Sequence, residues 1–228
     1  GREMSALVLS SSQFRADRFA GMAAAKRDGK IPSGLKCMSF NAFIESYAAS
    51  DFETAGIYIN YEQKSALILK TLAQNRREFN IDNALIENLN EAVGEFKSNK
   101  IDIGRVLKNM PPGKSLSYKC NRFLELYNHY EKILSKNNFI DYHDCVKNLF
   151  GSRDFYEHIK NSYELVIFDG LERLSPIETD LFAVALAAAR NAAVINEKTF
   201  CGISPQKLAF EQAVERCRAM GVEITAEK

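Results

Sequence analysis

The chain of 228 residues is long enough for one large domain or two small ones, and 46% of its residues are hydrophobic, as in most globular proteins. A formal net charge of +1 excludes a strong global field for nucleic acid, so any basic surface must be local. No apolar run approaches the ~20 residues of a membrane span, and the residues after Gly1 do not resemble a signal peptide.

Cysteine usage indicates a reducing compartment. The five cysteines are odd in number, widely spaced and free of any CxxC pair, which argues against a disulfide framework and against a zinc site. We therefore expect a cytoplasmic protein with reduced thiols at Cys37, Cys120, Cys145, Cys201 and Cys217.

The first segment of the chain has an α/β pattern. The apolar run at residues 6–9 predicts a strand, and Ser12 can cap a helix over residues 13–26. A loop rich in Gly and Pro follows, and then a second strand is expected at residues 35–38. Ser39 can cap the next helix, over residues 40–48.

The middle of the chain is expected to be helical. Asn60 and Gln63 have capping-box spacing, and Asp141 can cap a short helix that ends at Phe150. Two apolar stripes at helical spacing lie between them, one over Leu85, Ile86, Leu89, Val93 and Phe96 and one over Phe123, Tyr127, Tyr130 and Leu134. Because no alternating strand pattern occurs there, we expect an all-helical insertion over residues 50–160.

The α/β pattern then returns. Residues 165–168 form a continuous apolar run, typical of a strand covered on both faces, and end in Asp169 and Gly170. A helix begins at Ser175, with Pro176 at its first position and Glu178 completing a capping box. A strand at residues 192–196, a helix opened by Ser204 and Pro205, and a strand at residues 222–225 complete the expected domain. We therefore divide the chain into residues 1–49, 50–160 and 161–228.

Asp169 is the strongest candidate for a functional residue. Ligands of open α/β sheets bind beyond the carboxyl ends of the strands, where an aspartate that follows a buried strand must lie. In P-loop ATPases this position holds the aspartate that associates with Mg²⁺. Taken alone, Asp169 and Gly170 are equally compatible with a simple turn after a strand.

Four segments in order resemble motifs of UvrD/Rep-like superfamily 1 DNA helicases. Residues 163–178, YELVIFDGLERLSPIE, resemble the Walker B region, and residues 127–144, YNHYEKILSKNNFIDYHD, resemble the helix and turn before it. Residues 38–43, MSFNAF, are similar to a Thr-Phe-His-Ser-Phe segment that touches single-stranded DNA, and residues 7–12, LVLSSS, lie where the preceding DNA-contacting motif should be. The Asp-Gly version of this motif more closely resembles that of AddB-like nuclease subunits, whose helicase motifs are partly decayed.

The resemblance implies a partial P-loop NTPase (RecA-like) parallel-sheet domain with an inserted helical domain, acting on DNA in repair or recombination. It implies Mg-ATP as the cofactor of the intact parent, with Asp169, and less directly Glu172, on the Mg²⁺ side. It implies single-stranded DNA or a duplex junction as ligand, a nuclease or helicase subunit as partner, and no membrane. The DNA contacts at the sheet would come from Ser10, Ser11, Ser39, Phe40 and Asn41.

The chain also departs from an active helicase. It contains no Gly-x-x-x-x-Gly-Lys-Ser/Thr phosphate loop, so we expect no ATP hydrolysis by this chain alone, whether the loop precedes it in the parent or has been lost. Gly170 stands where the catalytic glutamate is usual, and no Gly-Asp-x-x-Gln pattern follows residues 193–195. The second RecA-like half of a motor is also absent from this sequence.

A local basic stretch gives separate support for DNA binding. Between Phe96 and Arg122 a single acid, Asp102, stands against seven cations: Lys97, Lys100, Arg105, Lys108, Lys114, Lys119 and Arg122. Such a surface suits phosphate contact, although a solvated surface of lysines fits the pattern equally well.

Three interpretations therefore stand at this point. The chain is a fragment of a helicase motor, inert alone, or a non-catalytic DNA-binding scaffold subunit of a helicase-nuclease complex. The third interpretation is an unrelated α/β protein with a helical cap.

Overall fold

A computed structural model of the chain describes residues 5–48, 56–74, 82–109, 114–170 and 174–195, together with 211, 214, 215, 218 and 219. The chain forms two compact units. Unit 1 comprises Gly1–Phe52 and Val146–Lys228, and unit 2 comprises Glu53–Cys145. Across the described ranges, no helix has the length and apolar character that a membrane crossing requires.

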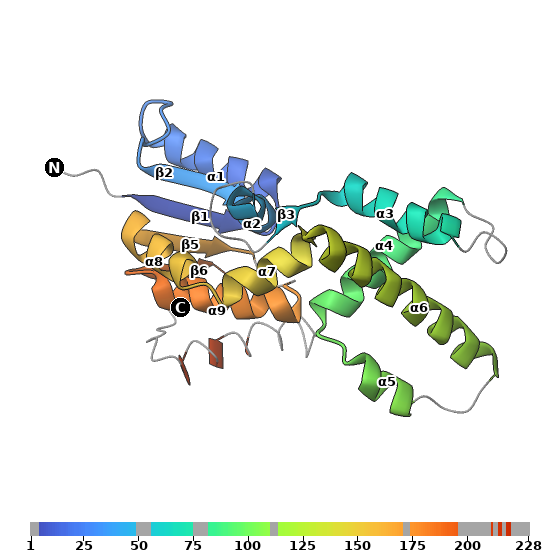
Figure 1. The fold of residues 1–228 in the computed structure, drawn as a ribbon. Helices are drawn as coiled ribbons and strands as arrows, with labels where there is room; N and C mark the ends of the chain where they lie inside the picture. The colour runs from blue at the N-terminus through green and yellow to red at the C-terminus, as the bar shows by residue number, and fades with distance from the viewer. Residues whose placement is uncertain are drawn as a thin grey trace. The chain divides into compact units, whose positions relative to one another are not determined.

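Unit 1 is built on a parallel sheet (Figure 1). Its strands are β1 (Ala6–Ser10), β2 (Leu35–Ser39), β5 (Leu165–Asp169) and β6 (Ala192–Ile195), in the order β2-β1-β5-β6 with every pair parallel. All five residues of the central strand β1 are buried, as expected for a strand covered on both faces. The predicted α/β class and all four predicted sheet segments are thus confirmed.

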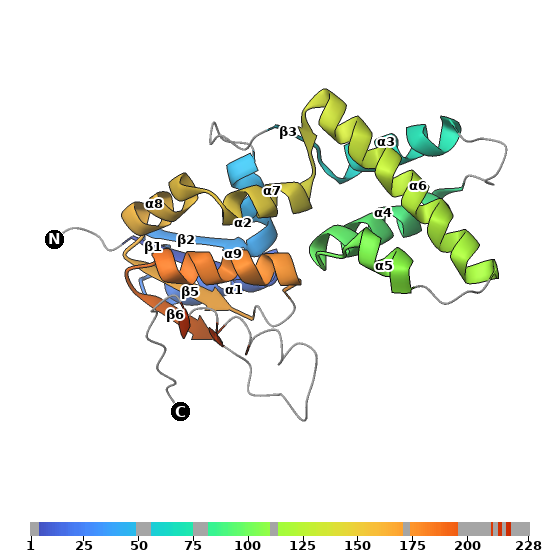
Figure 2. The same ribbon diagram turned by 60° about the horizontal axis from the view of Figure 1, so that its bottom comes forward.

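Helices cover both faces of this sheet. α1 (Gln13–Ala25) connects β1 to β2, whereas α9 (Pro176–Ala188) connects β5 to β6 in the opposite direction across the sheet. Because such crossovers are right-handed, α1 and α9 lie on opposite faces (Figure 2). Phe168 of β5 packs edge-on against Phe182 of α9, so Phe168 faces α9.

Two further helices pack together in unit 1. α2 (Phe40–Ala48) contributes Phe43 and Tyr47, whose rings make edge contacts with Phe155 of α8 (Arg153–Ser162). Phe43 is buried in this contact.

Unit 2 is mainly helical. It contains α3 (Tyr61–Gln74), α4 (Asn83–Ser98), α5 (Ile103–Asn109) and α6 (Lys114–Asn137), and α7 (Tyr142–Phe150) begins in it and ends in unit 1. Its core is formed by Ile59, Ile68, Leu72, Val93, Leu126, Tyr130 and Leu134. Both predicted apolar stripes supply this core, since Leu85, Ile86, Leu89, Phe123 and Tyr127 pack against it.

The structure corrects two of the predictions made from the sequence. The helical insertion was predicted to end at residue 160, but unit 2 ends at Cys145. The reason is that α8 packs within unit 1. It contacts α2 through aromatic rings and α9 through the hydrogen bond that the Tyr156 hydroxyl donates to the Ala187 carbonyl. The middle segment also contains two short parallel strands, β3 (Ile57–Tyr58) and β4 (Phe139–Ile140). The elements predicted at residues 204 and 222–225 lie outside the described residues.

Candidate functional site

Asp169 lies at the carboxyl edge of the parallel sheet, as predicted. It is the last residue of β5 and is in register with Ser10, the last residue of β1. Residues alternate between the two faces of a strand, and Phe168 faces α9, so Asp169 faces the side covered by α1. The backbone carbonyl of Asp169 accepts a hydrogen bond from the Ser11 amide at 3.2 Å, which ties the two strand ends together.

Arg15, in the first turn of α1, binds the Asp169 carboxylate with two parallel hydrogen bonds. Its Nη2 lies 3.0 Å from Oδ1 and its Nε lies 3.2 Å from Oδ2. The pair is partly shielded, with 28% of the Arg15 side chain and 13% of the Asp169 side chain exposed. Two-pronged arginine–carboxylate pairs are among the strongest side-chain interactions and fix geometry as well as charge.

Gly170 makes room for this guanidinium. It is buried, and its φ of 66° is in the left-handed region that favours glycine. A Cβ atom at this position would lie 2.5 Å from Cζ of Arg15, 2.8 Å from its Nη1 and 2.9 Å from its Nε. Any side chain at residue 170 would therefore displace Arg15 from Asp169.

These residues do not fit the Mg-ATP site that the helicase resemblance implies. Both carboxylate oxygens of Asp169 accept hydrogen bonds from a cation, and a Mg²⁺ ion beside that guanidinium would be repelled. The Mg²⁺ site at Asp169 stays a prediction, and Arg15 would have to leave the carboxylate before an ion could bind there. Glu172, the predicted accessory acid, lies outside the described residues, and among those described no cluster of three or more His, Cys, Asp or Glu residues could hold a metal ion.

The predicted DNA-contacting residues at this edge differ in accessibility. Ser11 and Asn41 are exposed, and Ser39 is half-buried, with its hydroxyl accepting the Ala42 amide at 3.1 Å as the predicted cap of α2. Ser10 is fully buried, and so is Phe40, with 2% of its surface exposed. The predicted contacts of these two residues with DNA do not fit their burial, because the strand and helix that carry them turn both side chains inward.

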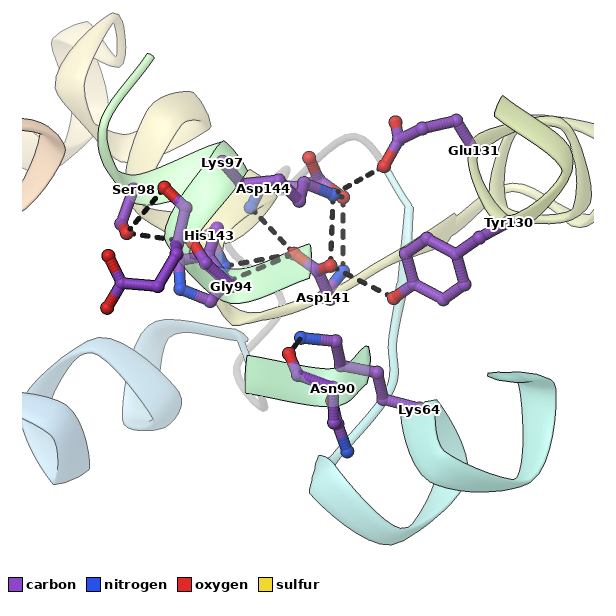
Figure 3. A network of polar contacts seen from close by, with 11 residues as sticks. Lys64, Asn90, Gly94, Lys97, Ser98, Tyr130, Glu131, Asp141, His143 and Asp144 are labelled. Atoms are coloured by element: carbon purple, nitrogen blue, oxygen red, sulfur yellow. Dashed lines mark hydrogen bonds and ion pairs between the residues drawn. The ribbon is translucent and has the colours of Figure 1, made fainter. Parts of the chain in front are cut away.

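Unit 2 contains a buried network of ion pairs centred on Lys97 (Figure 3). The ammonium nitrogen of Lys97 lies 2.7 Å from Asp144 Oδ2, 2.9 Å from Asp141 Oδ2 and 3.1 Å from Glu131 Oε1. Only 7% of the Lys97 side chain and 1% of the Asp141 side chain are exposed. Lys97 was predicted to contact DNA phosphate, and the structure corrects this, since its charge is already met by three carboxylates.

Asp141 connects three elements of unit 2. Its Oδ1 accepts the amides of His143 at 3.0 Å and Asp144 at 3.1 Å, so it caps α7 as predicted. Its Oδ2 accepts the hydroxyl of Tyr130 from α6 and the ammonium of Lys97 from α4. One carboxylate therefore fastens α4, α6 and the start of α7 to one another.

Burial and charge act against each other within this network. Burial alone would lower the pKa of Lys97, but Asp141, Asp144 and Glu131 outweigh it and raise that pKa above its ordinary value. Burial would raise the pKa of Asp141, but Lys97 brings it below its ordinary value. Burial raises the pKa of Asp144, and the neighbouring Asp141 charge adds to that rise. Asp141 and Lys97 thus form the ionised pair at the centre of the network.

A second buried lysine lies beside the network. Lys64 of α3 donates from Nζ to the carbonyl of Asn90 on α4 at 3.1 Å, and burial lowers its pKa. Gly94 of α4 lies against the His143 ring, where a Cβ would make a tight contact of 3.2 Å with Cε1. Since its central groups are enclosed and joined to one another, the network is suited to holding helices together.

The other basic residues that were predicted to contact DNA, and whose side chains the structure describes, are more accessible than Lys97. Lys100, Arg105, Lys108 and Lys119 are exposed, whereas Arg122 is half-buried and pairs with Glu125 at 2.8 Å. The side chain of Lys114 lies outside the described residues. The exposed residues Lys100, Arg105, Lys108 and Lys119 are called the basic segment below.

Sequence reasoning missed the partners of both carboxylate sites. No signal marked Arg15, because it lies 154 residues before Asp169 in the chain. Asp144 carried a weak signal, because it follows the cap residue Asp141 by three positions and its carboxylate also accepts the Asp141 amide. In comparisons with known proteins, the chain matches no protein-family model and no curated protein sequence.

Proposed function

We propose that this chain belongs to a cytoplasmic, helicase-like DNA-processing subunit that binds DNA in repair or recombination without hydrolysing ATP at Asp169. This is the scaffold interpretation, in which a P-loop-derived domain guides DNA beside a nuclease or helicase partner. The observation that carries the choice over a working motor is the engagement of both Asp169 carboxylate oxygens by Arg15.

The arrangement of the sheet supports the helicase-like origin. Two of the four segments that resemble helicase motifs, at residues 7–12 and 163–178, supply the neighbouring central strands β1 and β5. Their ends meet at one edge, where ligands of open α/β sheets bind. The mainly helical unit 2 is inserted in the chain between them.

The basic segment supports contact with phosphate. Its four exposed cations are close in sequence, from the end of α4 through α5 to the start of α6, whereas the chain as a whole is nearly neutral. A surface of this kind gives weak, sequence-independent binding, with a Kd of roughly 1–100 μM at physiological salt.

An ATPase assay tests the absence of a motor. We expect the purified chain to show no ATP hydrolysis, with or without single-stranded DNA. Turnover that is lost in Asp169→Ala would contradict the proposal, because it would place Asp169 in a working nucleotide site.

A DNA titration tests the basic segment. We expect the double variant Lys108→Glu with Lys119→Glu to bind labelled single-stranded DNA more weakly than the unmodified chain. The plot of log affinity against log salt concentration should flatten by about one unit for each lost phosphate contact. The matched control is Lys132→Glu with Lys136→Glu, which makes the same charge change at exposed positions of α6. Equal losses in both pairs would show that net charge matters and the basic segment does not.

A further inference from the structure

We propose that Arg15 is the resident cation of the Asp169 carboxylate, admitted by Gly170, and that it closes this sheet edge to divalent metal ions. The inference rests on contacts within unit 1 and holds whether or not the chain binds DNA. It assigns to Arg15 and Gly170 a joint role that neither residue suggests by itself.

The Asp169 carboxylate is paired with a cation of the chain itself. A carboxylate at the carboxyl edge of a parallel sheet, 87% shielded from solvent, needs a positive partner. Arg15 supplies one at 3.0 Å and 3.2 Å and uses both carboxylate oxygens. Divalent cations such as Mg²⁺ and Mn²⁺ bind through carboxylate oxygens, so they would have to compete with a tethered cation for the same atoms.

Gly170 provides the space that this guanidinium occupies. The guanidinium lies directly over the α-carbon of Gly170, where a Cβ would be 2.5 Å from Cζ. The amide of Gly170 is also held, because it donates to the carbonyl of Ile195 at 3.1 Å. With its backbone fixed between β5 and β6, residue 170 cannot move aside for a side chain, and only glycine leaves the position of Arg15 open.

Ser10 is the neighbour of Asp169 on the adjacent strand β1. Ser10 is in register with Asp169 and therefore points to the same face of the sheet. Its hydroxyl is buried and has no hydrogen-bond partner among the residues that the structure describes. Without the guanidinium, the Asp169 carboxylate and the Ser10 hydroxyl would be two neighbouring oxygen ligands, the start of a metal site that Arg15 keeps closed.

Paramagnetic broadening by Mn²⁺ tests the inference directly. In ¹H–¹⁵N spectra of the unmodified chain, we expect millimolar Mn²⁺ to leave the amide signals of Ser11, Asp169 and Gly170 no broader than those of buried residues elsewhere. In Arg15→Gln, which removes the charge, these three signals should broaden selectively. Adding Asp169→Asn should abolish that gain, because it removes the carboxylate ligand.

Three comparisons make the result specific. Arg15→Lys retains the positive charge and should keep Mn²⁺ out. Gly170→Ala displaces the guanidinium without deleting it and should admit Mn²⁺ as Arg15→Gln does. Arg18→Gln, at an exposed arginine of the same helix, should behave as the unmodified chain does.

Two outcomes would overturn the inference. One is selective broadening at the sheet edge of the unmodified chain, which would mean that a metal ion binds in the presence of Arg15. The other is no gain in broadening for a folded Arg15→Gln or Gly170→Ala protein. Well-dispersed spectra establish the fold of each variant, and the titration of the unmodified chain decides the metal question even where a variant does not fold.

Discussion

At the scale of single residues, Lys97 carries the largest predicted effect on stability. Its ammonium is enclosed by three carboxylates, one of which, Asp141, is 1% exposed. Removing one partner of a buried ion pair leaves an uncompensated charge and costs about 3–5 kcal/mol. We therefore expect Lys97→Met to lower the free energy of unfolding by about that amount in urea titrations.

The matched control for this variant is Lys132→Met, at an exposed lysine next to Glu131 in the chain. It should change the free energy of unfolding by less than about 0.5 kcal/mol. A similarly small change for both variants would mean that water or a dissolved cation compensates the three carboxylates when Lys97 is removed. The network would then not be a buried ion cluster.

The same network predicts a dependence of stability on pH. Because Lys97 holds the pKa of Asp141 below its ordinary value of 3.8, the folded state gains stability above that value and loses it as pH falls through the folded pKa. Asp141→Asn still caps α7 but has no charge to lose. We expect this variant to be less stable than the unmodified chain at pH 7, with a difference that shrinks below about pH 4 in urea titrations. A difference that stays constant with pH would exclude this linkage.

At the scale of secondary-structure elements, the start of α9 is stabilised by a local motif. The carboxylate of Glu178 accepts the amide of Ser175 at 2.8 Å and its hydroxyl at 2.7 Å. Glu178→Ala removes both bonds and should cost about 1 kcal/mol in the free energy of unfolding, as loss of a cap usually does. Glu178→Gln keeps an acceptor and should lose less than half of that, whereas equal losses for both would place the effect in the charge and not in the cap.

Such local features are what the sequence predicts well. Capping at Ser12, Asn60, Asp141 and Ser175 depends on residues three positions apart, and the structure places a hydrogen bond of this kind at each of these helix starts. The four sheet segments were predictable for a related reason, because parallel strands buried on both faces are continuous apolar runs.

Contacts between distant segments were not predictable. Asp141 was identified as a cap from its neighbours, but its ion pair with Lys97 joins residues 44 positions apart. Asp169 was placed correctly at the sheet edge, yet the identity of its cation depended on how α1 packs. Phe40 was expected to face DNA from its motif, but the burial of the α2 face that carries it decided otherwise. In each case the side-chain environment is set by tertiary packing, which local patterns do not encode.

At the scale of the whole molecule, the two units have separate bases for stability. The core of unit 2 is formed by residues between Ile59 and Leu134, and its ion network uses residues between Lys64 and Asp144. All of these lie in the single continuous segment Glu53–Cys145, whereas unit 1 is assembled from two segments of chain. A compact unit with its own core and a continuous chain has what independent folding requires.

We therefore expect a fragment of residues 53–151, which is unit 2 with the rest of α7, to fold alone. Circular dichroism should show a helical protein with a cooperative urea transition, because the buried core and the network around Lys97 are complete within it. Introducing Lys97→Met should destabilise the fragment by about 3–5 kcal/mol, as in the full chain, since every partner of Lys97 is retained. Lys132→Met is again the matched control. A fragment that is helical but melts without cooperativity would show that unit 2 needs the rest of the chain to fix its packing, and the ion network would then not be enough to order it.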